Sequence, residues 1–213
     1  MTLDADRAEA MTHMAVSHET AARLDVFVEL LLRWQRIKNL VAPSTLDQIW
    51  TRHVADSAQL APFLPSAATV VDLGSGAGFP GLVLAIVAGG RPGFHMHLVE
   101  SNGRKASFLR EAARAAGVAV SVHAIRIEAF TAQWSGKADF VTARALAPLE
   151  DLLDLGEILF QSGARGLFLK GKGSADELSE ARRSWNIDAH LFPSVTDSTG
   201  QIILIDSATR RSS

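Results

Sequence analysis

A short β-branched segment that runs directly into a glycine-rich loop constrains the fold of this chain more than any other feature. Residues 70–73 read Val-Val-Asp-Leu, and residues 74–81 read Gly-Ser-Gly-Ala-Gly-Phe-Pro-Gly. Glycine has no Cβ and tolerates positive φ, so this loop allows a sharp turn from strand to helix and a close approach of the backbone to a ligand. The helix that follows offers unpaired N–H groups at its start. The pattern therefore predicts an α/β fold with a ligand site at the end of this strand.

Strand and helix segments alternate along the rest of the chain. The strands are expected at residues 95–100, 119–124, 138–142 and 165–170, and the helices at residues 103–116, 149–160 and 176–183. Two strands, at residues 188–192 and 201–205, close the chain without a helix between them. Alternation requires crossover connections and predicts a mostly parallel sheet covered on both faces, whereas the terminal pair must be antiparallel.

The region before the glycine loop has the apolar spacing of helices. Residues 1–16 lack such a pattern and are expected to be a loose lead-in. From Leu24 to Ile37 apolar residues recur at steps of three and four, with Ser17 as the N-cap of this helix. A second helix is expected from a cap at Ser44 through Leu60, before two prolines.

Composition places the chain among soluble globular proteins, with 47% hydrophobic and 21% charged residues in a length of 213. We expect a helical subdomain over residues 1–65 and a ligand-binding α/β domain over residues 66–213. The absence of cysteine excludes disulfides and thiolate chemistry. The longest apolar run is far below the roughly 18 residues of a membrane span, and no secretion-signal pattern is present, so a cytoplasmic protein that contacts no membrane is expected. A monomer is expected because no long apolar helix face is left over.

Two ligand classes fit the glycine loop. The spacing Gly76-x-Gly78-x-x-Gly81, with Glu100 near the end of the next strand, is that of a dinucleotide site and would indicate an NAD-dependent oxidoreductase. The spacing Asp72-x-Gly74-x-Gly76-x-Gly78 instead fits S-adenosylmethionine. Asp72 would repel a pyrophosphate but suits a sulfonium ligand, and Glu100 can accept from ribose hydroxyls in either case. Asp72 and the antiparallel strand pair together favour the methyltransferase interpretation.

Further polar positions follow the later strands. Ile127 and Glu128 come after the third strand, where an adenine edge lies in such folds, although an ordinary loop explains this pair better when it is taken alone. Arg144 follows the fourth strand, at the edge where α/β sheets bind ligands. Its guanidinium suits a carboxylate or a guanine edge, and a structural salt bridge is the alternative. Lys170 and Lys172 follow the fifth strand.

Taken together, these residues resemble the RsmG (GidB) family, the bacterial small-subunit rRNA guanine-N7 methyltransferases. The resemblance covers residues from about 24 to 206. It is carried by Trp34, Lys38-Asn39-Leu40, Arg52-His53-Val54-Ala55-Asp56-Ser57, residues 71–82, Glu100-Ser101, Arg104-Lys105, Phe108-Leu109-Arg110, Arg126-Ile127-Glu128, Arg144-Ala145 and Leu169-Lys170-Gly171. The glycine loop alone separates methyltransferases poorly, whereas the block from Arg52 to Ser57 and the Arg144-Ala145 pair make the match specific.

The resemblance implies a class I, Rossmann-like methyltransferase fold with a seven-stranded, mostly parallel sheet, an antiparallel last strand and an N-terminal helical extension. It implies S-adenosylmethionine as the methyl donor and N7 of guanine 527 of 16S rRNA as the acceptor. The donor site predicted from the motif and the resemblance comprises Asp72, Gly74, Ser75, Gly76, Gly78, Phe79, Glu100, Ile127, Glu128 and Arg144. Glu100 stands where an aspartate is most often expected, and it keeps the carboxylate.

Guanine N7 carries a lone pair and no proton, so its methylation requires no general base, and we expect neither a catalytic side chain nor a metal. RNA contacts are expected from Lys38, Arg104, Arg144 and Lys170, within a wider basic set of Arg33, Arg36, Lys105 and Lys172. Arg144 could hold the donor carboxylate or orient the guanine, and both roles stay open at this stage. His95 and His97 are expected to pack rather than bind metal, and His53 to make a structural hydrogen bond. A non-catalytic ribosome-binding protein is a further alternative.

Overall fold

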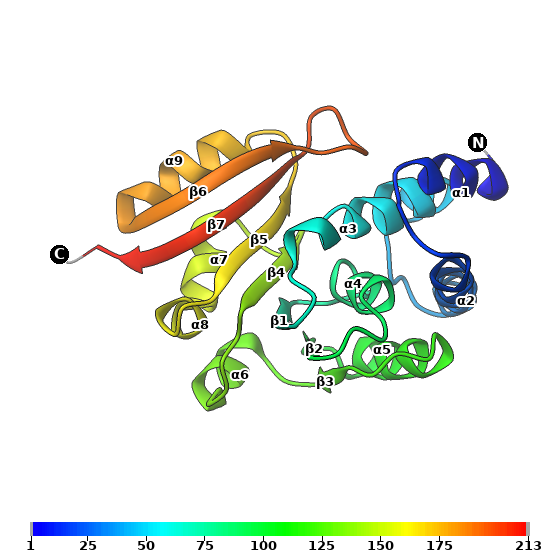
Figure 1. Ribbon diagram of the computed structural model, residues 1–213, viewed down its shortest axis with the longest axis horizontal. Helices are drawn as coiled ribbons and strands as arrows, with labels where there is room; N and C mark the ends of the chain where they lie inside the picture. The colour runs from blue at the N-terminus through cyan, green and yellow to red at the C-terminus, as the bar shows by residue number, and fades with distance from the viewer. Residues whose placement is uncertain (1, 212–213) are drawn as a thin grey trace.

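The computed structural model describes residues 2–211 and contains one seven-stranded sheet with the strand order β3-β2-β1-β4-β5-β7-β6 (Figure 1). The strands are β1 (Ala68–Leu73), β2 (Phe94–Val99), β3 (Ser121–His123), β4 (Phe140–Arg144), β5 (Arg165–Lys170), β6 (Trp185–Pro193) and β7 (Gln201–Arg210). The strands from β1 to β5 pair in parallel, whereas β7 is antiparallel to both β5 and β6. The predicted α/β class and the antiparallel terminal pair are therefore confirmed.

The glycine-rich loop leaves the sheet at its centre. Asp72 of β1 is in register with Leu98 of β2 on one side and Thr142 of β4 on the other. Because the neighbouring strands are parallel, their carboxyl ends meet at the same edge, where open α/β sheets bind their ligands. The loops after β1, β2, β4 and β5 all begin at this edge.

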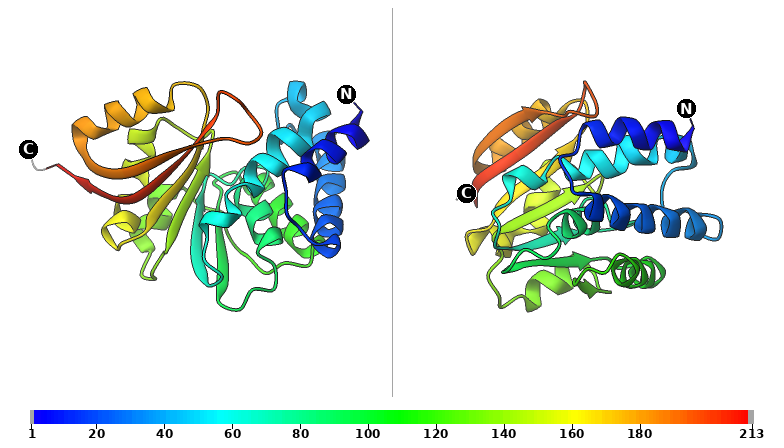
Figure 2. Two further views of the ribbon diagram at one scale, coloured as in Figure 1. Left: turned by 45° about the horizontal axis from the view of Figure 1, so that its top comes forward. Right: turned by 45° about the vertical axis from the view of Figure 1, so that its right-hand side comes forward.

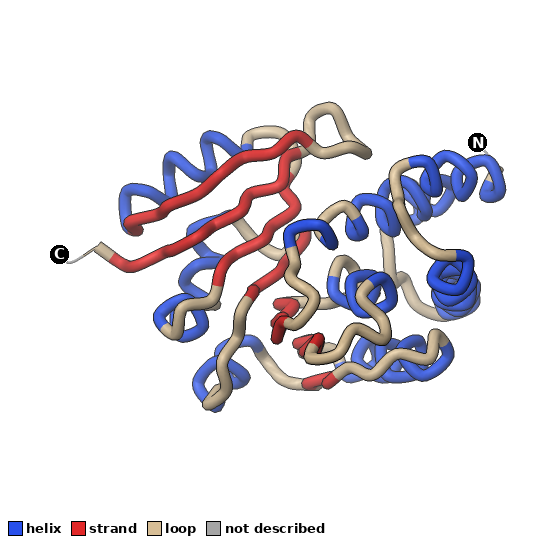
Figure 3. Tube along the Cα trace, viewed as in Figure 1, coloured by secondary structure: helices blue, strands red, loops and turns tan. Residues whose placement is uncertain are grey.

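Helices cover both faces of the sheet (Figures 2 and 3). On one face α4 (Gly81–Val87) and α5 (Gly103–Ala115) pack over a core that includes Val70. On the other face the core includes Val71 and lies beneath a second group of helices. These are α6 (Ile127–Gln133), α7 (Leu149–Leu155), α8 (Glu157–Gln161) and α9 (Ser174–Ser184). Successive residues of a strand point to opposite faces, so the buried run of β1 supplies both cores.

The N-terminal helices pack on the same core as α4 and α5. They are α1 (Leu3–Thr12), α2 (His18–Gln35), the 3₁₀ helix η1 (Pro43–Gln48), the π-helix η2 (Trp50–Ala55), α3 (Asp56–Ala58) and the 3₁₀ helix η3 (Ala61–Phe63). Ser17 caps α2 as expected, accepting from the main-chain N–H of Thr20. Phe27 of α2 contacts Phe79 and Phe108. The division at residue 65 stays a prediction.

Several expectations for the N-terminal region were wrong. Residues 3–12 are a helix rather than a loose lead-in, and the buried Asp6 fastens this helix to η2. The helix expected from Ser44 is broken into 3₁₀, π and α turns, and Ser44 is not its cap. Ile37 is 79% exposed because α2 ends at Gln35.

Two differences concern the α/β region. Residues 127–133 form α6, which the sequence did not predict, and the helix expected at residues 149–160 is divided at Gly156 into α7 and α8. None of the helices within residues 2–211 is long and apolar enough to cross a membrane.

Candidate active site

The glycine loop turns with three residues in the left-handed region. Gly74, Gly76 and Gly78 have φ values of 68°, 55° and 93°. L residues with side chains rarely adopt this backbone conformation, so the positions require glycine. The turn brings the main chain past the carboxyl end of β1 and leads directly into α4.

Asp72 stabilises the glycine loop through hydrogen bonds to its buried carboxylate. Its carboxylate is fully buried and accepts hydrogen bonds from the Thr142 hydroxyl at 2.7 Å and the Gly81 N–H at 3.3 Å. A Cβ built on Gly81 would come within 2.5 Å of Asp72 Oδ2, so glycine is needed at the start of α4. Burial raises the pKa of Asp72 to about 6. Asp72 therefore acts on the loop rather than presenting an open carboxylate to a ligand.

Glu100 holds the loop from the neighbouring strand end. One carboxylate oxygen accepts the Gly76 N–H at 2.9 Å, and the other accepts the Asn102 N–H at 2.7 Å. The residue is 8% exposed. A carboxylate oxygen can accept more than one hydrogen bond, so Glu100 can hold the loop and still bind hydroxyl groups.

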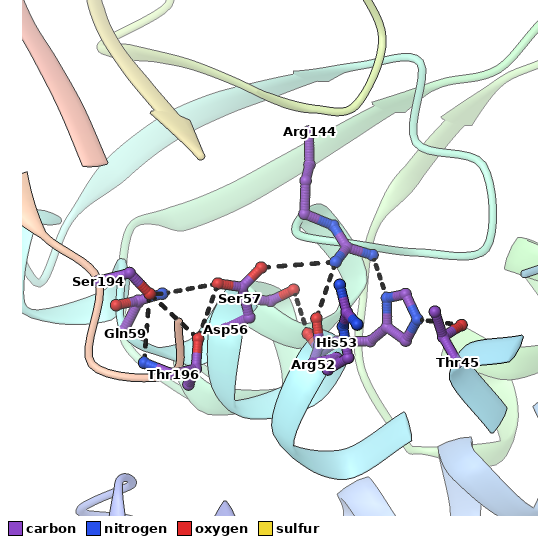
Figure 4. Close-up of polar contacts among 9 residues, drawn as sticks. All are labelled: Thr45, Arg52, His53, Asp56, Ser57, Gln59, Arg144, Ser194 and Thr196. Atoms are coloured by element: carbon purple, nitrogen blue, oxygen red, sulfur yellow. Dashed lines mark hydrogen bonds and ion pairs between the residues drawn. The ribbon is translucent and has the colours of Figure 1, made fainter. Parts of the chain in front are cut away.

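Arg144 ends β4 and is held by the π-helix η2 (Figure 4). Its Nη1 donates to the Arg52 carbonyl at 3.0 Å and lies 3.4 Å from Asp56 Oδ2, while its Nη2 lies 2.6 Å from His53 Nδ1. The π-helix supplies Arg52 and His53, and Asp56 follows as the first residue of α3, so the three acceptors lie on one side. π-helical turns are frequent at functional sites. Burial lowers the pKa of Arg144 and the nearby Asp56 opposes this shift, so the guanidinium remains charged.

Phe79 joins this cluster to the glycine loop. The guanidinium carbon of Arg144 lies 5.0 Å from the centre of the Phe79 ring, and the His53 ring stacks on the same phenyl at 5.0 Å. Phe79 is only 5% exposed, because Phe27 of α2 contacts it as well. The side chain of Phe79 thus fixes Arg144 relative to the loop.

The loop between β6 and β7 completes the cluster from the far end of the chain. Thr196 donates to Asp56 Oδ1 at 3.0 Å, so Asp56 joins this loop to Arg144. Gln59 accepts the Val195 N–H at 2.9 Å. It also donates to the Ser194 hydroxyl at 3.1 Å (Figure 4). Three distant parts of the sequence therefore meet at one edge of the sheet.

A cleft of about 960 Å³ opens beside Arg144. Its walls come from η1 and η2, the loop after β4, the end of β5 and the β6–β7 loop, and they include Glu9 of α1. Leu146 lies between the cleft and the glycine loop, because it lines the cleft and would also meet a Cβ on Gly74 at 2.7 Å. Its neighbour Ala145 has a φ of 50°, a conformation unusual for a residue with a side chain.

The other predicted site residues differ in their exposure and in their hydrogen-bond partners. Ile127 and Glu128 begin α6, with Glu128 exposed. Lys170 faces the cleft but is held internally, since its Nζ donates to the Ala147 carbonyl at 2.6 Å and to Glu177 at 2.8 Å. Lys38 and Arg104 are exposed, the first beyond the end of α2 and the second in the first turn of α5.

Three histidines form a separate group on β2 and β3. His97 Nδ1 lies 3.0 Å from His123 Nε2, and His95 Nε2 lies 2.9 Å from the Ser121 hydroxyl. Burial lowers the pKa of His97 to about 4. Within residues 2–211, no group of three or more His, Cys, Asp or Glu side chains is arranged to hold a metal ion.

Sequence reasoning assigned no site role to Thr45, Asp56 or the β6–β7 loop. The block from Arg52 to Ser57 contributed to the family resemblance, and within it only His53 was given a role, a structural hydrogen bond, although the Arg-His-x-x-Asp spacing was a usable signal. Arg52 O, His53 and Asp56 all contact Arg144. By contrast, no pattern in residues 194–200 indicates that they reach the helical region.

Comparison with known proteins decides the family. The model of the family "rRNA small subunit methyltransferase G" matches residues 20–203. The chain belongs to this family. It is 52% identical to the ribosomal RNA small subunit methyltransferase G of Methylorubrum populi over 96% of each chain. It is also 50% identical to the protein of the same name from Bradyrhizobium sp. strain ORS 278, over 99% of this chain and 95% of the other.

Solved structures show the same fold at low sequence identity. The cofactor-bound Rv0187 protein from MTB aligns with a TM-score of 0.58 and 16% identity over 87% of this chain and 89% of that one. A putative rRNA methylase from Clostridium thermocellum aligns with a TM-score of 0.53 and 12% identity over 73% and 93%. Together with the family match, the strand order with its antiparallel β7 supports the methyltransferase interpretation over the NAD-dependent oxidoreductase.

Proposed function

We propose that this protein transfers a methyl group from S-adenosylmethionine to N7 of guanine 527 of 16S rRNA. The observation that carries the proposal is the position of Arg144, which is fixed by η2 and Phe79 between the glycine loop and the 960 Å³ cleft. One side of this arginine suits the methyl donor, and the other opens into a space large enough for a nucleobase.

The residues at the glycine loop fit the donor. Gly74, Gly76 and Gly78 have no side chains of their own to keep a ligand from the main chain, and Glu100 keeps acceptor capacity for the ribose hydroxyls. Ile127 and Glu128 are suitably placed after β3 for the adenine. When bound, S-adenosylmethionine supplies an electrophilic methyl group on a positively charged sulfur.

The number of N–H groups that Arg144 has left over favours a contact with the carboxylate of the methyl donor. A guanidinium has five N–H groups, and Arg52, His53 and Asp56 accept three hydrogen bonds from it. The Nε–H and one Nη2 hydrogen have no partner among residues 2–211, and two such donors match a carboxylate. A bidentate contact with guanine O6 and N7 would instead occupy the lone pair that must attack the methyl group.

The chain's contribution to the reaction is then positioning. N7 carries no proton, so no side chain needs to remove one as the methyl group moves from sulfur to nitrogen. The cleft between η2, the loop after β4 and the β6–β7 loop would hold the base and exclude water. A base in folded rRNA must leave its stack to enter such a cleft.

Exposed basic residues would contact the RNA backbone. Lys38 and Arg104 are exposed and free to do so, whereas Lys170 would have to release Glu177 before it contacted a phosphate. The cytoplasm, where ribosomal subunits are made, would be the site of action, and we propose that the protein acts as a monomer without a metal.

The deciding experiment is methyl transfer from labelled S-adenosylmethionine to small ribosomal subunits that lack native methylation at this guanine. We expect label in 7-methylguanosine at that single position after digestion of the RNA. Label at another base would overturn the proposed substrate. Donor binding without any methyl transfer, on naked rRNA as well as on subunits, would favour a non-catalytic ribosome-binding protein.

A further inference from the structure

The contacts of His53 determine which of its ring nitrogens carries the proton. Arg144 Nη2 lies 2.6 Å from His53 Nδ1, and a guanidinium can only donate hydrogen bonds. His53 Nδ1 must therefore offer its lone pair. A neutral imidazole with a bare Nδ1 carries its proton on Nε2, which lies 2.8 Å from the Thr45 hydroxyl oxygen.

Thr45 continues the same direction of donation. Its hydroxyl donates to the Ala42 carbonyl at 2.8 Å, so its oxygen is free to accept from His53. These hydrogen bonds form a relay that runs in one sense from Arg144 to His53, from His53 to Thr45 and from Thr45 to the Ala42 carbonyl. Figure 4 shows the contacts of Arg144 with His53 and of His53 with Thr45. Reversing any ring proton would place two donors against each other.

Two further observations support a neutral, fixed ring. His53 stacks on Phe79 at 5.0 Å, which sets the plane of the imidazole. Burial, Arg144 and Arg52 together lower the pKa of His53 to about 3. The ring therefore does not gain a second proton near neutral pH, and Nδ1 remains an acceptor.

We propose that His53 and Thr45 are positioning residues that fix the Arg144 guanidinium, leaving its Nε–H edge free for the methyl donor. This inference rests on the proposed function for its choice of ligand, but the proton position can be tested without any ligand. Neither residue touches the reacting atoms in this arrangement. Their effect on donor binding is transmitted through the single hydrogen bond between His53 Nδ1 and Arg144.

The first test is the ¹⁵N spectrum of the histidine side chains in the ligand-free protein, with His53 assigned by its loss in His53→Asn. We expect the neutral form with the proton on Nε2 at pH 7. A proton on Nδ1, or a doubly protonated ring, would overturn the relay, whether or not the protein methylates RNA.

The second test measures binding of S-adenosylhomocysteine to Thr45→Val and Thr45→Ser. Valine removes the acceptor for Nε2–H and should weaken binding about tenfold, while serine should restore it to within about twofold of the parent protein. Thr12→Val is the matched control, because the Thr12 hydroxyl likewise donates to a carbonyl three residues earlier, that of Glu9 at 2.7 Å, and among residues 2–211 makes no hydrogen bond to a histidine side chain. Equal affinities for Thr45→Val and the parent would overturn the positioning role.

The outcomes separate this inference from the proposed function. If the parent protein fails to bind S-adenosylhomocysteine, the proposed donor is wrong, yet the ¹⁵N spectrum still reports the relay. If the parent binds with His53 protonated on Nε2 and Thr45→Val loses affinity, both stand. A parent protein that binds while its His53 carries the proton on Nδ1 contradicts the relay alone.

Discussion

Glu100 accepts the main-chain N–H of Gly76 at 2.9 Å, so the acid expected to bind the ribose of the donor also holds the glycine loop. Its second oxygen accepts the N–H of Asn102, the N-cap residue of α5. The carboxylate therefore connects the first two ligand-side loops of the sheet before any ligand is present.

Glu100→Gln should weaken S-adenosylhomocysteine binding by about tenfold, because an amide offers one acceptor oxygen where two N–H groups require two. Calorimetric titration measures the affinity, and hydrogen exchange at Gly76 reports on the loop. Glu29→Gln, on the exposed side of α2, is the control. Unchanged affinity with unchanged exchange would show that Glu100 has neither role.

Arg144→Ala should show whether Arg144 binds the carboxylate of the methyl donor or the guanine. If Arg144 binds the donor carboxylate, the variant should lose at least tenfold affinity for S-adenosylhomocysteine and keep its affinity for 5′-methylthioadenosine, which lacks the amino-acid group. The two titrations form a matched pair on one variant. Normal S-adenosylhomocysteine binding with reduced turnover at saturating donor would instead assign Arg144 to the guanine.

Asp72 should make stability fall with rising pH. Burial raises its pKa from 3.8 to about 6, so between about pH 4 and pH 6 the folded protein holds a proton that the unfolded chain has lost. The free energy of unfolding should decrease across this window by at most about 1.4 kcal/mol per pH unit.

Urea denaturation of the parent and Asp72→Asn at several pH values checks this sign. The histidines with lowered pKa values act in the opposite direction, but they are common to both proteins, so the difference in unfolding free energy isolates Asp72. The unfolding free energy of the parent minus that of Asp72→Asn should fall from pH 4 to pH 6. Asp151→Asn, an exposed acid in α7, should show a flat difference.

Asp6→Ala should destabilise the protein by about 3 kcal/mol. The buried carboxylate accepts from the N–H groups of Trp50 and Thr51 and from the Thr51 hydroxyl, and alanine leaves these donors without partners. Thermal or urea unfolding measures the loss. Asp4→Ala, exposed in the same helical turn, should cost less than about 0.5 kcal/mol, and equal losses would contradict the anchoring role.

Charge reversal should locate the RNA-binding face. Lys38→Glu and Arg104→Glu should each weaken binding to small subunits and reduce the dependence of log affinity on log salt by about one. Filter binding at a series of salt concentrations gives both quantities. Lys137→Glu is the control, because this exposed lysine pairs with Asp139 just before β4. If all three variants behave alike, the proposed RNA face is wrong.

The α/β region could be predicted closely because its signals are local. The strand expected at residues 165–170 coincides with β5, and the antiparallel pairing of β6 with β7 followed from the missing crossover helix. The glycine loop likewise required only the φ preference of glycine and the order of strand and helix.

The N-terminal region was harder to predict because its conformation depends on tertiary contacts. Asp6 stabilises α1 through η2, more than forty residues later, and nothing in the local sequence indicates this bond. Gln35 ends α2 by accepting the N–H groups of Leu40 and Val41, so the apolar spacing that extended to Ile37 was misleading. The roles of Thr45 and Asp56 depend in the same way on the position of Arg144.

The bond between Gln59 and Val195 spans 136 residues and has a consequence for biosynthesis. Asp56 holds Arg144 from one side and accepts from Thr196 on the other, so its full set of contacts exists only after residue 196 has been made. A growing chain can form β1 and the glycine loop early, but it lacks the finished wall of the cleft. The wall of the cleft is therefore complete only after the ribosome has synthesised residue 196, and nascent chains that end before this residue should lack it.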